Sequence, residues 1–142
     1  MDYELKENAV VPADYLRLKT AVGWGGGNAP QKQVEMGLKN TLFSVAAVHQ
    51  GQVIGMGRLV GDGVIICYVQ DVIVLPEFQG MGIGRAIMKR LMEFVESNGM
   101  AGTKISVGLF AAKGKEPFYE KLGFCARGDG DSGPGMEMVV KL

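Results

Sequence analysis

The sequence predicts one α/β domain in which a mixed β-sheet is flanked by helices. Two observations lead to this fold class. Residues 64–75, VIICYVQDVIVL, are apolar and β-branched almost throughout, which is typical of a strand buried on both faces. Residues 80–97 follow with the spacing of an amphipathic helix, and residues 103–111 form another strand-like run. This order predicts a right-handed βαβ crossover.

The other elements follow from periodicity and from turn residues. No internal repeat or linker interrupts the chain, so residues 1–142 are expected to form a single domain. The elements expected are helices over 12–22, 31–38 and 115–123, a glycine-rich loop over 23–30, a hairpin over 41–63 that turns at 49–52, and a closing strand over 136–142.

Charge and hydropathy exclude two classes of partner. Lys plus Arg and Asp plus Glu number 15 each, so net charge gives no reason to expect nucleic acid or an anionic membrane as the main partner. The longest unbroken apolar run, VIICYV, has about six residues, whereas a membrane span needs about 20. The first residues are acidic and polar, unlike a signal peptide. We therefore expect a soluble cytoplasmic protein.

The cysteine and histidine content gives no metal-binding pattern. Cys67 and Cys125 stand far apart, and His49 is the only histidine, so no zinc-ligand spacing exists and no metal is expected. Two isolated cysteines fit reduced, buried thiols, and a disulfide is the alternative.

Three glycines at alternate positions mark the candidate functional turn. Gly80, Gly82 and Gly84 lie between the apolar run and the helix, where backbone N–H groups meet the positive end of a helix dipole. Such a turn binds anions, most often phosphate. Neither the Rossmann nor the Walker A pattern fits the spacing. The alternative is that these glycines only permit a tight strand-to-helix turn.

Two motifs carry a family resemblance. Residues 79–84, QGMGIG, fit the pattern Q/R-x-x-G-x-G/A, and about 35 residues on, Tyr119, Gly123 and Phe124 fit Y-x-x-x-G-F. Over residues 40–142 the sequence therefore resembles the GNAT superfamily of N-acetyltransferases. The resemblance implies a mostly antiparallel central sheet with a βαβ coenzyme-binding unit, and acetyl-CoA as co-substrate. It also implies acetyl transfer to a primary amine by direct attack in a ternary complex, without a covalent intermediate.

The resemblance further implies which residues bind acetyl-CoA. The turn would hold the pyrophosphate on backbone amides, and the strand before it would offer a backbone N–H to the thioester carbonyl. These cofactor-binding residues are Ile73, Val74, Leu75, Gln79, Gly80, Met81, Gly82, Ile83, Gly84 and Arg85. One position departs from the family, because many members have Asn where this chain has Ala112. Lys113 or Lys115 would then approach the coenzyme, or both belong to a solvated loop.

Tyr119 and Asp71 are the candidate catalytic residues. Tyr119 would protonate the departing thiolate, since a phenol is protonated at neutral pH; alternatively it packs with Phe118 and Phe124. Asp71 and Gln70 interrupt an apolar strand, and an unpaired buried carboxylate is costly. Asp71 either faces the cleft, where it would bind the amine or accept its proton, or is paired structurally.

The acceptor is the least defined part of the prediction. Trp24 is an aromatic wall or a core anchor, and Asp129 and Asp131 attract a cationic amine or form a flexible acidic turn. A small-molecule amine is the expected acceptor. A protein or peptide amine, and a non-catalytic coenzyme-A-binding domain, are the alternatives. Dimers are frequent in the family, so a homodimer is a further expectation.

Overall fold

A computed structural model describes residues 1–128 and 130–142, and they form two compact units, Met1–Gly108 and Leu109–Leu142. The single-domain expectation stays a prediction. The elements in chain order are β1 (Glu4–Glu7), α1 (Pro12–Ala21), the 3-10 helix η1 (Gly25–Asn28), α2 (Gln31–Lys39), β2 (Phe43–His49), β3 (Gln52–Gly61), β4 (Ile66–Val74), the 3-10 helix η2 (Pro76–Phe78), α3 (Ile83–Asn98), β5 (Ser106–Leu109) and, in the second unit, α4 (Glu116–Glu120).

The sheet is mixed, as the sequence predicts. Its strand order is β1-β2-β3-β4-β5, and the first four strands pair antiparallel. β2 and β3 join through Gln50 and Gly51, whose φ values of 49° and 75° fit the two-residue turn that matches strand twist. The Ser106 N–H donates to the Ile65 carbonyl, and Gly108 faces Tyr68, so β5 runs parallel to β4.

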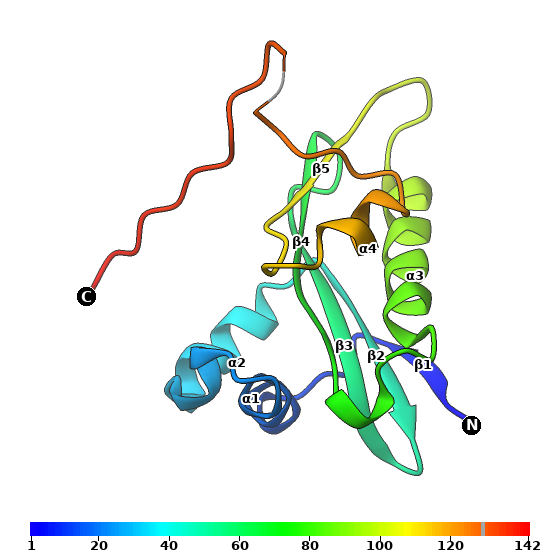
Figure 1. Cartoon of the computed structure of the whole chain (residues 1–142), viewed down its shortest axis with the longest axis vertical. Coiled ribbons are helices and arrows are strands. Elements are labelled where there is room, and N and C mark those ends of the chain that lie inside the picture. Colours follow the sequence, from blue (N-terminus) through cyan, green and yellow to red (C-terminus); the bar gives the residue numbers. More distant parts are fainter. Residues whose placement is uncertain (129) are drawn as a thin grey trace. The chain divides into compact units, whose positions relative to one another are not determined.

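Helices cover both faces of this sheet in the first unit. Figure 1 shows α1 and α2 on one side of β3 and β4, and α3 on the other. Apolar residues recur along α3 at the spacing of one helical face, and that face packs on β2, β3 and β4. The buried residues of α3 are Ile83, Ile87, Met88, Leu91 and Val95. Among the described residues, no helix has both the length and the apolarity needed to cross a membrane.

Gly57 lets α3 come unusually close to β3. A Cβ at this position would lie 2.8 Å from Cγ2 of Ile87 and 3.1 Å from Cδ1 of Leu91, distances that well-packed carbon atoms do not adopt. The absence of a side chain on β3 therefore sets the spacing between helix and sheet.

β4 differs from the expected strand buried on both faces. Its residues alternate in burial, with Cys67, Val69, Asp71 and Ile73 buried, Ile66 exposed and the other residues half-buried. Apolar residues on both faces suggested complete burial, yet every second residue of the strand is covered only in part. The thiols also differ from expectation in one respect, since both are free but only Cys67 is buried, and Cys125 is exposed.

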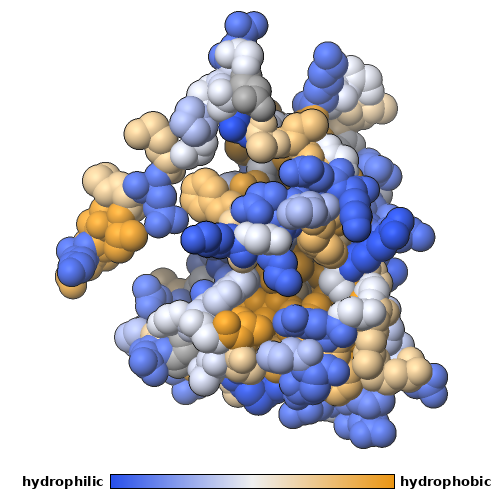
Figure 2. Space-filling view, viewed as in Figure 1, coloured by the Kyte–Doolittle hydropathy of each residue, from blue (hydrophilic) through white to orange (hydrophobic). Residues whose placement is uncertain are grey.

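The closing strand predicted over residues 136–142 is wrong. That segment has no regular secondary structure, and its large apolar side chains are exposed, with Met136 at 87% and Leu142 fully so. Figure 2 shows the hydrophobic atoms along this end of the chain. β-Propensity identified the segment, but a strand also needs a partner for its backbone N–H and C=O groups. In the described part of the second unit, only the last residue of β5 is in a strand.

Replacing Gly57 with Ala should destabilise the fold. The added methyl group would force Ile87 or Leu91 out of position, and overpacking of this kind costs about 1–3 kcal/mol. Chemical denaturation monitored by circular dichroism measures the loss. Gly37→Ala is the control, because Gly37 lies in α2 with no heavy atom within 4 Å of an added Cβ, so its stability should hold or rise. Equal stability of the two variants would contradict the close approach.

Candidate active site

The segment between β4 and α3 is a turn whose backbone favours glycine. Gly80 and Gly82 have φ values of 80° and 81°, in a region that other side chains disfavour. Gly82 is the N-cap of α3, and its carbonyl accepts the amide N–H of Ala86 at 3.0 Å. The glycines therefore form the strand-to-helix turn that the sequence predicts.

The space beside this turn is open. A Cβ added at Gly80 or at Gly82 would have no heavy atom within 4 Å, and Met81 between them is 54% exposed. No packing contact requires glycine here, although the backbone conformation does. A ligand can therefore approach the backbone closely along this turn.

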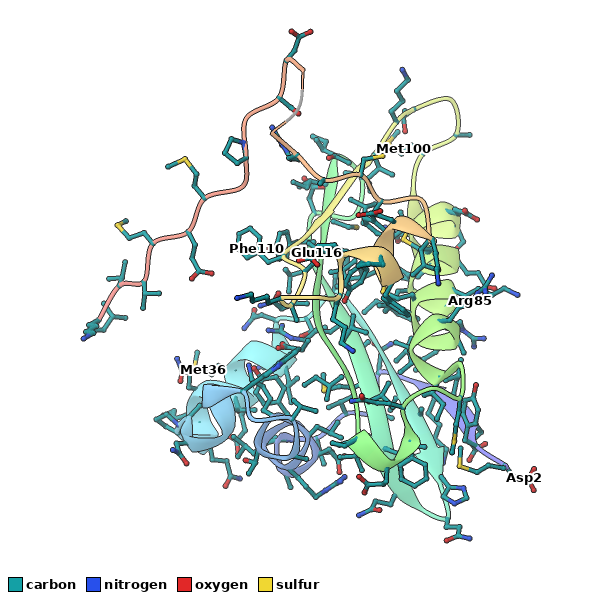
Figure 3. The ribbon with its side chains drawn as sticks, in the orientation of Figure 1. Asp2, Met36, Arg85, Met100, Phe110 and Glu116 are labelled. Carbon is teal, nitrogen blue, oxygen red and sulfur yellow. The ribbon has the colours of Figure 1, made fainter. Side chains whose placement is uncertain are left out.

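The start of α3 provides amide donors to the same space. The N–H groups of Ile83, Gly84 and Arg85 lie in the first helical turn, where the helix has no carbonyl to accept them. In this fully described segment, α3 has no side-chain cap and no acidic residue in its first turn. Figure 3 shows the Arg85 side chain on the side of α3 turned away from the sheet. The combination suits an anion such as phosphate.

The strand before the turn exposes one amide to its free edge. The Leu75 N–H is already used, since it donates to the Ile54 carbonyl at 2.9 Å. Alternation along an antiparallel strand directs Ile73 toward β3 as well and Val74 away from it. The Val74 carbonyl accepts a hydrogen bond from Nε2 of Gln79 at 2.9 Å, consistent with that direction. Of the three amides predicted as oxyanion donors, Val74 alone faces away from β3.

β5 leaves this edge of β4 uncovered. The pairing begins with Ser106 beside Ile65, and β5 has four residues, so it borders only the first half of β4. The described part of the first unit has no strand beside the second half. Figure 2 shows hydrophobic surface over this region of β4. An extended ligand can lie along such an edge and pair with the backbone.

Asp71 forms a β-bulge at the middle of β4. Met56 pairs with Ile73 and Arg58 with Gln70, so Gly57 faces two residues, Asp71 and Val72. Asp71 has a φ of 54°, a conformation that Asp and Asn tolerate better than most residues. A bulge bends its strand and increases the twist. It lies where β4 leaves β5 and heads for the glycine turn.

The carboxylate of Asp71 is buried and held by two cations. Its Oδ2 accepts a hydrogen bond from Nε of Arg58 at 2.8 Å, and its Oδ1 lies 3.4 Å from Nζ of Lys19. The Asp71 side chain is only 4% exposed, and those of Arg58 and Lys19 are 14% and 16% exposed. Of the two arrangements that the sequence leaves open, the structure has the paired one.

Lys19 extends this cluster to two aromatic side chains. Its Nζ donates to the Tyr15 hydroxyl at 3.3 Å and lies 5.6 Å from the centre of the Trp24 ring. Trp24 is half-buried, so the ring covers the lysine and remains partly accessible. Next to the cluster, α1, α2 and β3 enclose a cavity of about 280 Å³ that opens to the surface and includes Tyr15 and Arg58 in its lining.

Tyr119 belongs to the second unit. Its ring packs edge-on against Phe118 and Phe124, with centroids 4.9 and 6.0 Å apart, so it does take part in the aromatic packing that the sequence offered as an alternative. Burial raises the pKa of the Tyr119 phenol above its ordinary value. The hydroxyl therefore carries its proton at neutral pH.

The other residues predicted to shape the acceptor site are Asp129 and Asp131. Asp131 is exposed, and Asp129 lies outside the residues that the structure describes. Sequence reasoning missed Arg58, Lys19 and Tyr15. A lone arginine in the apolar stretch GMGRLV was the available signal, since a buried cation needs a partner, and Asp71 was the unexplained carboxylate.

Comparison with known proteins gives one consistent family. Residues 39–126 match the family model described as an acetyltransferase (GNAT) domain. The Staphylococcus aureus protein SA2161 has a similar structure, with a TM-score of 0.84 and 29% identity, over 98% of this chain and 100% of that one. The Streptococcus pneumoniae GNAT-family acetyltransferase SP0256 has a TM-score of 0.80 and 30% identity, over 99% of this chain and 100% of that one.

Curated relatives are longer than this chain. The N-acetyltransferase ycf52 of Pyropia yezoensis is 28% identical over 121 residues, which cover 82% of this chain and 66% of that protein. The chain thus spans slightly less than two thirds of that relative.

Replacing Asp71 with Asn should destabilise the protein by about 3 kcal/mol, because Arg58 and Lys19 would lose their counter-charge in a buried place. Asp71→Ala should cost about 1 kcal/mol more, since Ala tolerates the positive φ less well than Asn. Urea denaturation measures both. Glu4→Gln is the matched control, because Glu4 pairs with Lys6 and both side chains are exposed, so the change should affect stability little. A loss for Asp71→Asn no larger than the control's would show that the ion pairs do not hold the strand.

Proposed function

Because this chain belongs to the GNAT acetyltransferase family, we propose that it transfers the acetyl group of acetyl-CoA to a primary amine of a small molecule, by direct attack in a ternary complex. The observation that carries the proposal is the open glycine turn at the start of α3, beside the uncovered edge of β4. We keep the cytoplasmic location and the homodimer as proposals that rest on sequence alone.

The residues of the glycine turn would have different roles in binding acetyl-CoA. The amides of Gly82, Ile83, Gly84 and Arg85 would bind the pyrophosphate, with Gly80 and Met81 providing the open approach. The Ile83 side chain is buried, so only its amide is available. Gln79 acts differently, because its side chain ties the turn to the Val74 carbonyl.

Acetyl transfer then needs positioning and stabilisation of the carbonyl oxygen. The edge of β4 aligns the thioester arm, and alignment of reactants supplies a large part of the rate enhancement. The Val74 N–H would donate to the oxygen as negative charge develops on it.

Asp71 would act by holding β4 in position, and not as the base that accepts the proton of the amine. Both of its oxygens are engaged by cations, so accepting a proton from the amine would break an ion pair. It holds the bulge that directs the second half of β4. Tyr119 is the proposed general acid, as its place in the family motif implies, and its half-buried phenol carries at neutral pH the proton that this role requires.

The names of two further relatives point to different acceptors. A rice protein named serotonin N-acetyltransferase 2 is 37% identical over 79 residues, 56% of this chain and 38% of that protein. A soybean protein named histone acetyltransferase TAP1 is 30% identical over 132 residues, 84% of this chain and 54% of that protein. The cavity of about 280 Å³ favours a small molecule, and a protein amine is the second candidate. A coenzyme-A-binding domain without catalysis would bind acetyl-CoA and release no thiol with any amine.

Gly82→Val should weaken acetyl-CoA binding by at least tenfold, because the side chain would enter the open space and distort the amide donors. Gly102→Val is the matched control. Gly102 has nearly the same φ, 79°, and also has no heavy atom within 4 Å of an added Cβ, but it lies outside the turn. Both variants should lose similar stability, while calorimetry should show lost affinity for Gly82→Val only. Equal affinity in the two would mean that the glycines serve the turn alone.

Tyr119→Phe should lower kcat by about 10²–10⁴-fold, since it removes the proton donor and keeps the packed ring. Acetyl-CoA affinity and melting temperature should change little. Because burial raises the pKa of the Tyr119 phenol, the proton donor is lost only as the pH rises through that raised pKa. In the pH–rate profile of the wild type, the alkaline limb due to Tyr119 should therefore lie above pH 10.0. Thiol release measured across pH tests both. A wild-type rate in the variant would mean that Tyr119 serves only to pack with Phe118 and Phe124.

A further inference from the structure

The cavity between α1, α2 and β3 has a lining suited to a charged ligand. It lies wholly within the first unit, on the face of the sheet that is packed against α1 and α2 in Figure 1. Its lining combines polar and apolar side chains. The lining residues are Tyr15, Ala29, Gln33, Val34, Gly37, Leu38 and Arg58.

Arg58 lines the cavity and has one guanidinium nitrogen that no described residue engages. Its Nε donates to Asp71, and its Nη1 donates to Oγ1 of Thr41 at 3.1 Å. Its Nη2 donates no hydrogen bond to any of the described residues. A guanidinium held on two sides by neighbouring groups is oriented in advance, so little side-chain freedom is lost when the third nitrogen binds a ligand.

Two more donors border the cavity. The Tyr15 hydroxyl accepts a hydrogen bond from Lys19, which leaves its own hydrogen available to donate. The exposed side-chain amide of Gln33 also borders the cavity and has no partner within the described part of the chain. Three donors of different types therefore border one small volume.

The charged groups around the cavity have a net positive charge. No Asp or Glu is in the lining, and the cluster behind it holds two cations, Arg58 and Lys19, against the single carboxylate of Asp71. The net local charge is thus positive although the whole chain is neutral. A positive, donor-rich pocket favours an anionic group over a cationic one.

Gly37 is an independent indication that the space is kept open. It sits inside α2, where glycine weakens a helix relative to almost any other residue. It has no positive φ, and no atom within 4 Å would oppose an added Cβ, so neither the backbone nor packing requires glycine. A larger side chain at this position would enter the cavity that Gly37 lines.

We propose that this cavity binds an anionic group of the acceptor, a carboxylate or a phosphate, that is several bonds away from the amine to be acetylated. This inference rests on the proposed acetyl transfer. The apolar lining of Val34 and Leu38 would contact the chain that connects the two groups.

The separation follows from the register of β3 and β4. Arg58 pairs with Gln70, and Gly55 pairs with Val74, the proposed donor to the thioester oxygen, so the two positions are three residues apart along β3. At about 3.3 Å per residue this is roughly 10 Å. An α-amino acid is too short to bridge Arg58 and the thioester with its own carboxylate and α-amine. An ω-amino acid or an amine with a remote phosphate has the required length.

The experiment compares acceptors that differ in one group. Initial rates with acetyl-CoA are measured for 6-aminohexanoate, 5-aminopentyl phosphate, glycine and uncharged hexylamine. The two long anionic amines should have kcat/KM at least tenfold above hexylamine and glycine, because a hydrogen bond to a charged group is worth about that factor. The anionic amine with the higher kcat/KM shows whether the site prefers a carboxylate or a phosphate.

Gly37→Leu tests the location. A leucine would add a side chain at a position that lines the cavity and has open space beside it, and it favours the helix, so the melting temperature should not fall. It should remove the tenfold preference while acetyl-CoA affinity stays within twofold. Met36→Leu is the matched control, since Met36 is next in sequence but 57% exposed and outside the lining, on the outer side of α2 in Figure 3.

A direct binding measurement separates the two proposals. Calorimetry with 6-aminohexanoate in the absence of acetyl-CoA should detect binding to the wild type and to Met36→Leu, and a loss of at least tenfold in Gly37→Leu. Anionic and uncharged amines used equally well, or unchanged 6-aminohexanoate binding in Gly37→Leu, would overturn the anion site and leave acetyl transfer standing. Binding of 6-aminohexanoate with no thiol release from any amine would instead remove the proposed transfer.

Discussion

The carboxylate of Asp71 joins three elements of the first unit. Through Arg58 it is tied to β3, through Lys19 to α1, and its own backbone is the bulge in β4. A buried carboxylate is stable only when its charge is compensated, and the bulge conformation is tolerated because the residue is Asp. The direction of the second half of β4, the orientation of the Val74 amide and the guanidinium beside the cavity all depend on this one group.

Glycine serves three separate physical purposes in the same unit. Gly57 allows α3 to approach β3, since a Cβ there would lie 2.8 Å from Ile87. Gly82 adopts a left-handed backbone that begins α3 with its amides exposed. Gly37 has an ordinary helical conformation and open space beside it. The high glycine content therefore reflects close packing, backbone geometry and free volume at distinct positions rather than general flexibility.

Local pattern was enough to predict the turn and the elements around it, but not the cluster behind it. The glycine turn, α3 and the hairpin at Gln50 and Gly51 follow from residues adjacent in sequence, and the structure has them where they were expected. The ion pairs of Asp71 join residues 13 and 52 positions apart, and no local pattern encodes such a partner. The closing segment failed for the same reason, because strand propensity over residues 136–142 does not supply the strand it would pair with.

The two ion pairs of Asp71 also imply an order of assembly. Arg58 and Asp71 face each other across neighbouring strands of a meander, so their contact closes a short loop, whereas Lys19 must be brought back over 52 residues. Closing the longer loop costs more chain entropy, and contacts of that kind tend to form later in folding. We expect β2, β3 and β4 to form the early nucleus with α3, and α1 to dock after them. In the native state, local opening would then release α1 first, so amide hydrogen exchange in α1 should be faster than in the central strands.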